Sequence, residues 1–123
     1  MTVGGGTLST ASISHFETLN VTDTESITAA NAGAAIASST LTMAASKTLT
    51  MTLAQNTGLD TSATVSGASQ TVVLTTGGTT TAIAGIENYT LSDSATTLTL
   101  SDAGTSVLGG SGSDTIRVRT RTT

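Results

Sequence analysis

One segment of the chain, residues 109–117, combines glycines with an acidic side chain in a pattern that could hold a metal ion. It reads GGSGSDTIR, which satisfies G-G-x-G-x-D-x-U-x at every specified position. The glycines let the backbone turn sharply and aim carbonyl oxygens inward, Asp114 offers a hard anionic oxygen, and Ile116 anchors the following strand. Calcium binds about six to eight oxygens, so one loop cannot complete its shell. We therefore predict a partial calcium site with Gly110, Gly112 and Asp114 as metal ligands.

Two further aspartates lie between strand-like segments and are candidate ligands for the same cation. Asp93 and Asp102 would add carboxylate oxygens if the fold brought them to the loop. Aspartates between strands also cap turns, because the short side chain bonds nearby backbone N–H groups. We favour caps for both and keep Asp93 and Asp102 as metal candidates. The alternative for 109–113 is a flexible Gly/Ser linker.

Other groups that could do chemistry are scarce. The chain has one histidine and no cysteine, so the common catalytic and zinc-binding constellations lose their main members. Glu17 and Glu87 occupy matching places in two related segments, but no acid–base partner accompanies them, and stacked or capping positions explain them better. His15 has no neighbour at metal-ligand spacing and is expected at the surface. We therefore expect no enzyme activity.

The charge pattern limits the partners of the chain. Four Lys and Arg face eight Asp and Glu, which gives a net charge of -4 and an isoelectric point near 4.5. This acidic balance argues against nucleic acid and anionic membranes as partners. No apolar run approaches the roughly 18 residues of a membrane span, and the start lacks the regions of a signal peptide. We expect a piece of a longer protein whose export signal, if it has one, lies outside these residues.

The elements that must position these residues are mostly strands. Threonine is the commonest residue, and β-branched side chains favour the pleated, half-buried surface of a strand. Apolar and hydroxyl side chains alternate in five short runs: 18–22, 40–43, 48–53, 90–92 and 97–100. Each run predicts a strand with one buried face, and Gly or Asp between most runs predicts tight turns. The Ala-rich segment 25–37 could instead form a short helix.

Internal repetition is the strongest indication of the architecture. Two units, 13–23 and 83–93, share the pattern I-x-x-[FI]-E-x-[LY]-x-[LV]-[ST]-D. Apolar residues also recur at steps of nine: Tyr89, Leu98, Val107 and Ile116. Short repeats of single strands are typical of a solenoid, in which each coil buries its apolar face against its neighbours. We predict one all-β domain over 1–123, a right-handed parallel β-solenoid, with the short helix near 25–37 as an option.

The C-terminal third resembles the RTX, or haemolysin-type, calcium-binding repeat proteins and bacterial surface-layer proteins. Residues 109–117 match the RTX nonapeptide, and 85–91, GIENYTL, are similar to the GIENLTL strand that often leads into such repeats. Residues 16–19, FETL, are similar to the GFETL form of the same proteins. The resemblance implies a parallel β-roll or β-helix, calcium-dependent folding and type I secretion. An extracellular or cell-surface location follows from it.

This resemblance is incomplete in two ways. Only one full nonapeptide is present, and the preceding coil reads SDAG at 101–104 instead of GGxG. An RTX calcium is normally held between loops two nonapeptides apart, and the position eighteen residues before Asp114 is Thr96. The expected calcium site is therefore incomplete or atypical.

Two functions are compatible with these features. The first is a non-enzymatic structural module of a secreted or cell-surface bacterial protein, with calcium-assisted folding or assembly and self-association through open terminal coils. The alternative is a Thr-rich ice-binding solenoid, because ranks of threonine at strand spacing can order water. The T-x-T triplets that begin at Thr40, Thr48 and Thr97 are irregularly spaced, which disfavours a flat array. A polysaccharide lyase or similar β-helix enzyme would need a charged, aromatic cleft that the sequence does not provide.

Overall fold

Short strands make up most of the protein. The structure is a computed structural model that describes residues 2–8, 17–27, 40–59, 63–66 and 68–119. These residues form thirteen strands and one helix: β1 (Thr2–Val3), β2 (Gly6–Leu8), β3 (Thr18–Val21), β4 (Glu25–Ile27), β5 (Thr40–Ala44), β6 (Thr48–Met51), α2 (Leu53–Gly58), β7 (Ala63–Ser66), β8 (Thr71–Leu74), β9 (Gly78–Thr81), β10 (Asn88–Thr90), β11 (Thr96–Leu100), β12 (Ser106–Leu108) and β13 (Thr115–Val118). All five predicted runs contain or overlap a strand.

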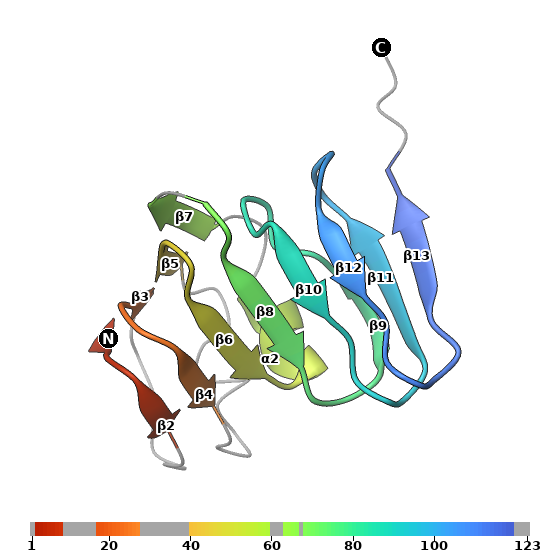
Figure 1. The fold of residues 1–123 in the computed structure, drawn as a ribbon, viewed down its shortest axis with the longest axis horizontal. Helices are drawn as coiled ribbons and strands as arrows, with labels where there is room; N and C mark the ends of the chain where they lie inside the picture. Colours follow the sequence, from red (N-terminus) through yellow and green to blue (C-terminus); the bar gives the residue numbers. More distant parts are fainter. Residues whose placement is uncertain (1, 9–16, 28–39, 60–62, 67, 120–123) are drawn as a thin grey trace.

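The strands form three parallel sheets around a common axis. The long sheet has the order β12-β10-β8-β6-β4-β2, the N-terminal sheet has the order β1-β3-β5-β7, and the C-terminal sheet has the order β13-β11-β9. The chain alternates between the long sheet and the opposite wall, so that it makes about five turns (Figure 1). Strands of the near wall run downward and those of the far wall upward as the chain advances to the right in that view, which is a right-handed coil. The predicted right-handed parallel β-solenoid is confirmed.

The nine-residue period of the sequence corresponds to half a coil. Leu98 lies beside Ile116 in the C-terminal sheet, and Tyr89 lies beside Val107 in the long sheet. Each pair is separated by two steps of nine, so one strand of each coil lies on each wall. The N-terminal coils are longer, since Val21 lies beside Met43 and the extra chain is inserted between strands.

The core is a stack of apolar side chains between the two walls. In β11 the burial alternates along the strand, so that Leu98 is fully buried while Thr97 and Thr99 lie on the outer face. A buried leucine of this kind stabilises the fold by roughly 1.5–3 kcal/mol. Leu91 and Leu100 are also buried, as expected. The buried apolar residues are Leu19, Val21, Ile27, Leu41, Met43, Leu49, Met51, Leu59, Val72, Leu74, Ala82, Ile83, Ile86, Tyr89, Leu91, Leu98 and Leu100.

Two core predictions held only in part. Val107 is partly buried and packs against the core. Ile116 is level with Leu98 in register but is 41% exposed, because no described strand covers the outer edge of β13. The last described coil therefore contributes less to the core than the alternation predicted.

The helix does not begin where the sequence suggested. Residues 25–27 form β4, so the option of a helix over 25–37 is wrong there, and 28–39 lie outside the described residues. A buried strand position for Glu25 and Ile27 outweighs the helix propensity of the alanines that follow.

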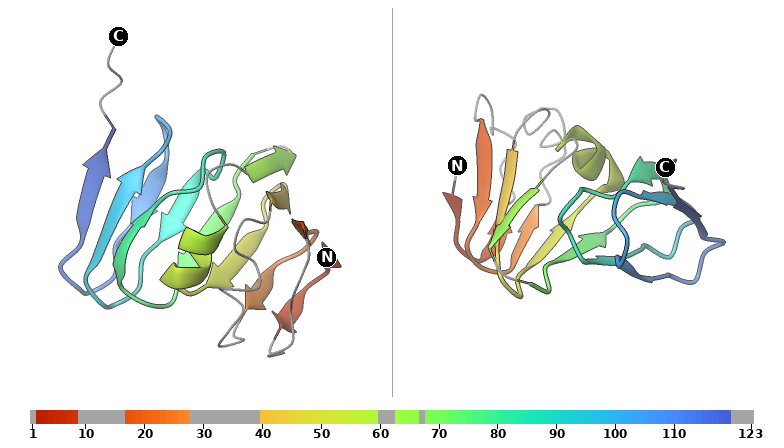
Figure 2. Two further views of the ribbon diagram at one scale, coloured as in Figure 1. Left: turned by 180° about the vertical axis from the view of Figure 1, so that it is seen from behind. Right: turned by 90° about the horizontal axis from the view of Figure 1, so that it is seen from above.

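The helix that the structure shows, α2, carries its own start signal. The backbone N–H of Gln55 donates to Thr52 Oγ1 at 3.2 Å, and the backbone N–H of Thr52 donates to Gln55 Oε1 at 2.8 Å. This reciprocal capping box satisfies two N–H groups that a helix start leaves open. The helix lies beside β9 on the wall opposite the long sheet (Figure 2). It occupies the place that a neighbouring strand of the C-terminal sheet would fill.

Candidate functional site

The functional candidates lie in the turns that join the two walls. We call the turns that lead into the long sheet, 4–5, 22–24, 45–47, 68–70, 82–87 and 101–105, the inbound edge. We call the turns that lead from the long sheet to the C-terminal sheet, 75–77, 91–95 and 109–114, the outbound edge. The two edges lie at opposite ends of the strands, so a side chain on one edge cannot share a ligand with a side chain on the other.

Asp114 of the nonapeptide joins two coils at the outbound edge. Its Oδ1 accepts a hydrogen bond from the backbone N–H of Thr96 at 3.0 Å, and its Oδ2 accepts one from the backbone N–H of Gly110 at 3.1 Å. Thr96 lies eighteen residues, or one coil, before Asp114, at the position where an RTX site would need a second ligand. Both carboxylate oxygens therefore bond N–H groups, and Asp114 serves as a cap between coils.

Asp93 makes the reverse connection on the same edge. Its Oδ1 accepts from the backbone N–H of Ser111 in the next coil at 3.0 Å. This bond, and a second one from the Ser111 side chain, hold the pKa of Asp93 below its usual range. The structure thus brings Asp93 to the loop of Asp114, as the sequence allowed.

The glycines of the nonapeptide permit close contact between coils. A Cβ on Gly110 would overlap the carbonyl oxygen of Ser92, and a Cβ on Gly112 would lie 2.7 Å from the backbone nitrogen of Ala95. Gly110 and Gly112 are not among the described glycines with positive φ, so the expected sharp turn is not the reason for glycine here. The close packing against 92–95 supports a structural loop over the flexible-linker alternative.

Asp102 lies at the other edge. Its Oδ2 accepts from the backbone N–H of Gly85, in the preceding coil, at 2.8 Å. It sits on the inbound edge, one strand length from Asp93 and Asp114, and so is a turn cap in the described structure. The structure therefore does not bring Asp102 together with Asp93 and Asp114. Asp93 and Asp102 are nine residues apart, which is half a coil, and successive half coils end at opposite edges. The two aspartates therefore lie on different edges.

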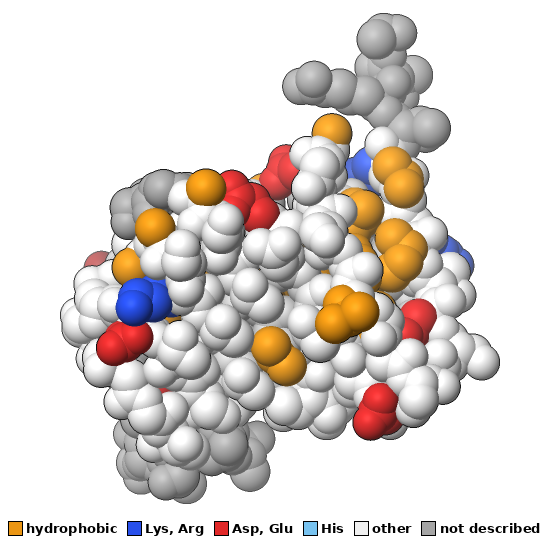
Figure 3. Space-filling model, viewed as in Figure 1, with side chains coloured by type: hydrophobic (Ala, Val, Ile, Leu, Met, Phe, Trp, Pro, Cys, Tyr) orange, Lys and Arg blue, Asp and Glu red, His pale blue; other side chains and the backbone are white. Residues whose placement is uncertain are grey.

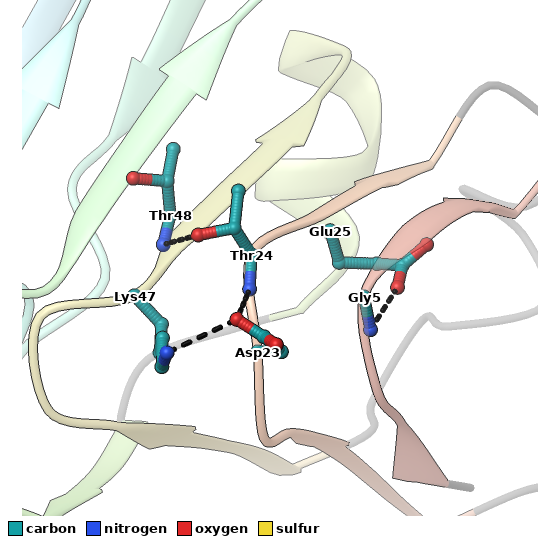
Figure 4. Close-up of polar contacts among 6 residues, drawn as sticks. All are labelled: Gly5, Asp23, Thr24, Glu25, Lys47 and Thr48. Atoms are coloured by element: carbon teal, nitrogen blue, oxygen red, sulfur yellow. Dashed lines mark hydrogen bonds and ion pairs between the residues drawn. The ribbon is translucent and has the colours of Figure 1, made fainter.

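The inbound edge shows the same chemistry in its first coils (Figure 4). Glu25 Oε2 accepts from the backbone N–H of Gly5 in the preceding coil at 3.1 Å, although Glu25 is only 4% exposed. Asp23 forms an ion pair of 3.0 Å with Lys47 in the following coil, and this bond is the largest cause that lowers the pKa of Asp23. Farther along, Glu87 accepts from the backbone N–H of Ser69. Each carboxylate therefore ties one coil to the next.

The described carboxylates are divided between the two edges of the solenoid. No three acidic, histidine or cysteine side chains of the described residues come close enough to hold a metal ion. The outbound edge offers Asp93 and Asp114, whose oxygens already accept N–H groups, whereas calcium needs about six to eight oxygen ligands. The residues present therefore fit a calcium shell poorly.

The paired glutamates of the two repeat units are on different walls. Glu17 precedes β3 of the N-terminal sheet, and Glu87 precedes β10 of the long sheet. Their backbone carbonyls have matching roles, since each accepts an N–H from the next coil, of Thr40 and Ser106 respectively, at 2.8 Å. The repeated pattern thus encodes the same strand start on two walls. His15 lies outside the described residues.

A buried polar cluster, which the sequence reasoning missed, joins α2 to both walls. Tyr89 of the long sheet accepts at its hydroxyl from the backbone N–H of Ile83 at 2.8 Å and donates to Asn56 Oδ1 at 2.9 Å. Asn56 Nδ2 donates to Thr80 Oγ1 at 2.9 Å and to the carbonyl of Thr81 at 3.0 Å. Burial raises the pKa of the Tyr89 phenol far above its usual value. The one tyrosine of the chain was a signal, because a buried phenol needs a partner.

A hollow of about 560 Å³ lies beside this cluster. Its lining comprises Asn56, Thr57, Thr79, Thr80, Thr81, Ala82, Ile83, Ala84, Thr99, Ser101 and Arg119. These residues offer hydroxyls, one amide and one guanidinium, with no carboxylate or imidazole among them. The lining can bind polar groups but supplies no acid–base pair.

The outer face of the C-terminal sheet bears threonines in register. The strand pairing aligns two ranks, Thr79–Thr97–Thr115 and Thr81–Thr99–Arg117. The three T-x-T triplets noted in the sequence lie on three different sheets, in β5, β6 and β11. They form no common face, but the triplet of β11 gains threonine neighbours that its spacing did not show.

Comparison with known protein families, curated proteins and solved structures finds no match to this chain. The resemblance to RTX and surface-layer proteins therefore rests on the motifs alone. Within the described residues, no helix is long and apolar enough to cross a membrane.

Proposed function

We propose that this chain is a non-enzymatic structural module of a secreted or cell-surface bacterial protein. The observation that carries the proposal is the use of carboxylates as connections between coils. Glu25, Glu87, Asp93, Asp102 and Asp114 each accept a backbone N–H from an adjacent coil. Groups that an enzyme or a metal site would expose are thus employed in holding the solenoid together. The motif resemblance supports the bacterial, extracellular setting.

Calcium-assisted folding or assembly stays a prediction. Asp93 and Asp114 are the residues that would contribute to such a site, together with oxygens from the 109–113 loop or from another chain. Because their present bonds to N–H groups already close the edge, the solenoid should fold without the cation. Far-UV circular dichroism in chelator and in calcium tests this: equal spectra and equal unfolding midpoints are expected.

Two measurements test the structural role: the cooperativity of the unfolding transition and an assay for polysaccharide cleavage. A stacked solenoid should unfold cooperatively, and its solutions should hydrolyse or cleave no polysaccharide. Arg119→Ala and Thr81→Val alter the hollow, whereas Thr50→Val on the outer face of the long sheet is a matched control. Turnover of a polysaccharide that the first two variants abolish and the control retains would refute a purely structural role.

Ice binding remains a second candidate because of the threonine ranks on the C-terminal sheet. Strands roughly 4.8 Å apart, with every second side chain on one face, give a regular grid of hydroxyls and methyl groups that can order water. Thermal hysteresis measurements test this candidate. Thr97→Lys should remove the activity and Thr50→Lys should retain it, while an absence of hysteresis in the parent chain would exclude ice binding.

A further inference from the structure

The C-terminal coil presents an apolar end. Val118 on β13 is 72% exposed and Ile116 is 41% exposed, and both are level with the buried Leu100 and Leu98, so they lie at the open end of the core. Leu108 on β12 is 66% exposed but is level with Thr90, so it lies on the outer face of the long sheet. Among the residues whose burial the structure describes, no other large hydrophobic residue is exposed. Figure 3 shows hydrophobic side chains gathered at this end of the molecule, with basic side chains beside them. We call Ile116 and Val118 the end patch.

Both ends also present strand edges in matching places. In the described chain β12 pairs only with β10 and β13 only with β11, while at the other end β2 pairs only with β4 and β1 only with β3. Each end thus has one open strand on each wall. Open, parallel strand edges can accept a further strand.

The two ends differ in charge. Arg117 and Arg119 belong to the C-terminal coil, at β13. At the N-terminal end, the Asp23 side chain lies directly against Gly5, about 3.4 Å from where a Cβ on that glycine would stand. Because Gly4 and Gly5 carry no side chains, the first inbound turn itself does not cover the Asp23 carboxylate. Arg119 at one end and Asp23 at the other are therefore groups of opposite charge.

We propose that the end patch docks on the N-terminal coil of a second copy of this chain, head to tail. In this arrangement β13 lies beside β1 and β12 beside β2 of the second copy, so that both walls continue across the junction. Arg119 follows β13 on the inbound edge and, after a rotamer change of the kind common on docking, reaches Asp23 across the glycine turn. Lys47 already makes the same kind of link to Asp23 within the chain, at 3.0 Å. The inference rests on the proposed structural role and names its partner.

Sedimentation velocity at rising concentration tests the proposal on the 123-residue chain. The parent chain should form a concentration-dependent series of oligomers. Arg119→Asp and Asp23→Arg should each weaken association about tenfold, because attraction becomes repulsion at a surface pair. Arg117→Asp is the matched control, since Arg117 lies on the outer face of the sheet, beside Thr99, and should change association much less.

Mixing the two variants gives the sharper result. Neither Arg119→Asp nor Asp23→Arg should associate well alone. An equal mixture should form oligomers in which the two variants alternate, because the introduced carboxylate of the first variant meets the introduced guanidinium of the second, and the unchanged Arg119 of the second meets the unchanged Asp23 of the first. Circular dichroism of every sample shows whether each variant is folded, so that a loss of association can be distinguished from a loss of folding. A folded parent chain that stays monomeric, or a mixture that associates no better than its components, would overturn the head-to-tail contact and leave the structural role standing. Loss of cooperative folding in the parent chain would instead overturn the structural role.

Discussion

Removing the Tyr89 hydroxyl should destabilise the solenoid more than removing any exposed hydroxyl does. In Tyr89→Phe the ring still fills its place, but Asn56 Oδ1 and the Ile83 N–H lose a buried partner. A buried polar group left unsatisfied costs about 1–3 kcal/mol, so two such groups give a loss of about 2–6 kcal/mol. For a domain of this size the thermal midpoint should fall by roughly 10 °C or more.

The same tyrosine provides a direct assay, because the chain has no other tyrosine and no tryptophan. Burial favours the neutral phenol and raises the pKa of Tyr89 in the folded state. Unfolded tyrosine ionises near about pH 10. Stability is therefore fully present below about pH 10 and is lost as the pH rises toward the folded-state pKa, since the unfolded chain releases the proton first. Tyrosinate absorbance should appear together with the loss of circular dichroism.

A matched control distinguishes the effect of burying the hydroxyl from the effect of removing a hydroxyl as such. Thr79→Val also exchanges a hydroxyl for an apolar group, but on the exposed outer face, and should shift stability by no more than about 0.5 kcal/mol. Tyr89→Phe should also lose the alkaline transition. Ionisation of Tyr89 near its ordinary value in a chain that stays folded, or equal effects of the two variants, would refute the buried-cluster argument.

Three further outcomes are expected from the core and the outbound edge. Leu98→Asp buries an unpaired charge and should unfold the C-terminal coils, whereas Thr97→Asp on the outer face should have little effect in denaturant titrations; equal effects would show a wrong register. Calorimetry should give millimolar calcium affinity at best, and a micromolar site abolished by Asp114→Ala would contradict the cap assignment. Because the Ser111 bonds lower the pKa of Asp93, its contribution is present above about pH 4 and lost as the pH falls through the folded-state pKa. Asp93→Asn should flatten that part of an acid unfolding curve, and an unchanged curve would count against the bond.

The period of the pattern made the fold predictable. Alternation at Thr97, Leu98 and Thr99 indicates a strand with one buried face, and the nine-residue step fixes one strand per half coil. Helix α2 was not predicted because its N-cap, Thr52, and its first residue, Leu53, belong to the run 48–53 that predicted a strand. Its start signal, Thr52 with Gln55 three residues later, was present but competes with that alternation.

The candidate site was predictable only in its local part. The contact of Asp114 with its own loop follows from the motif, whereas the partner one coil away depends on coil length. Asp93 joins that loop because it lies one coil before Ser111, and Asp102 does not because it lies half a coil away from it. Residue type alone makes both Asp93 and Asp102 candidates for a cap or a ligand. Their positions along the coil decide the edge on which each side chain lies.

The contacts between successive coils also explain how a chain with few charges and a thin core can form a stable solenoid. Each turn leaves backbone N–H groups that no strand pairs, and these must find acceptors. A calcium ladder would leave the N–H groups open and neutralise the carboxylates with metal. Here the N–H groups and the carboxylates satisfy each other, at both edges and between successive coils. Because a charged acceptor forms a stronger bond than a neutral one, a few acidic residues suffice to connect the coils of the stack.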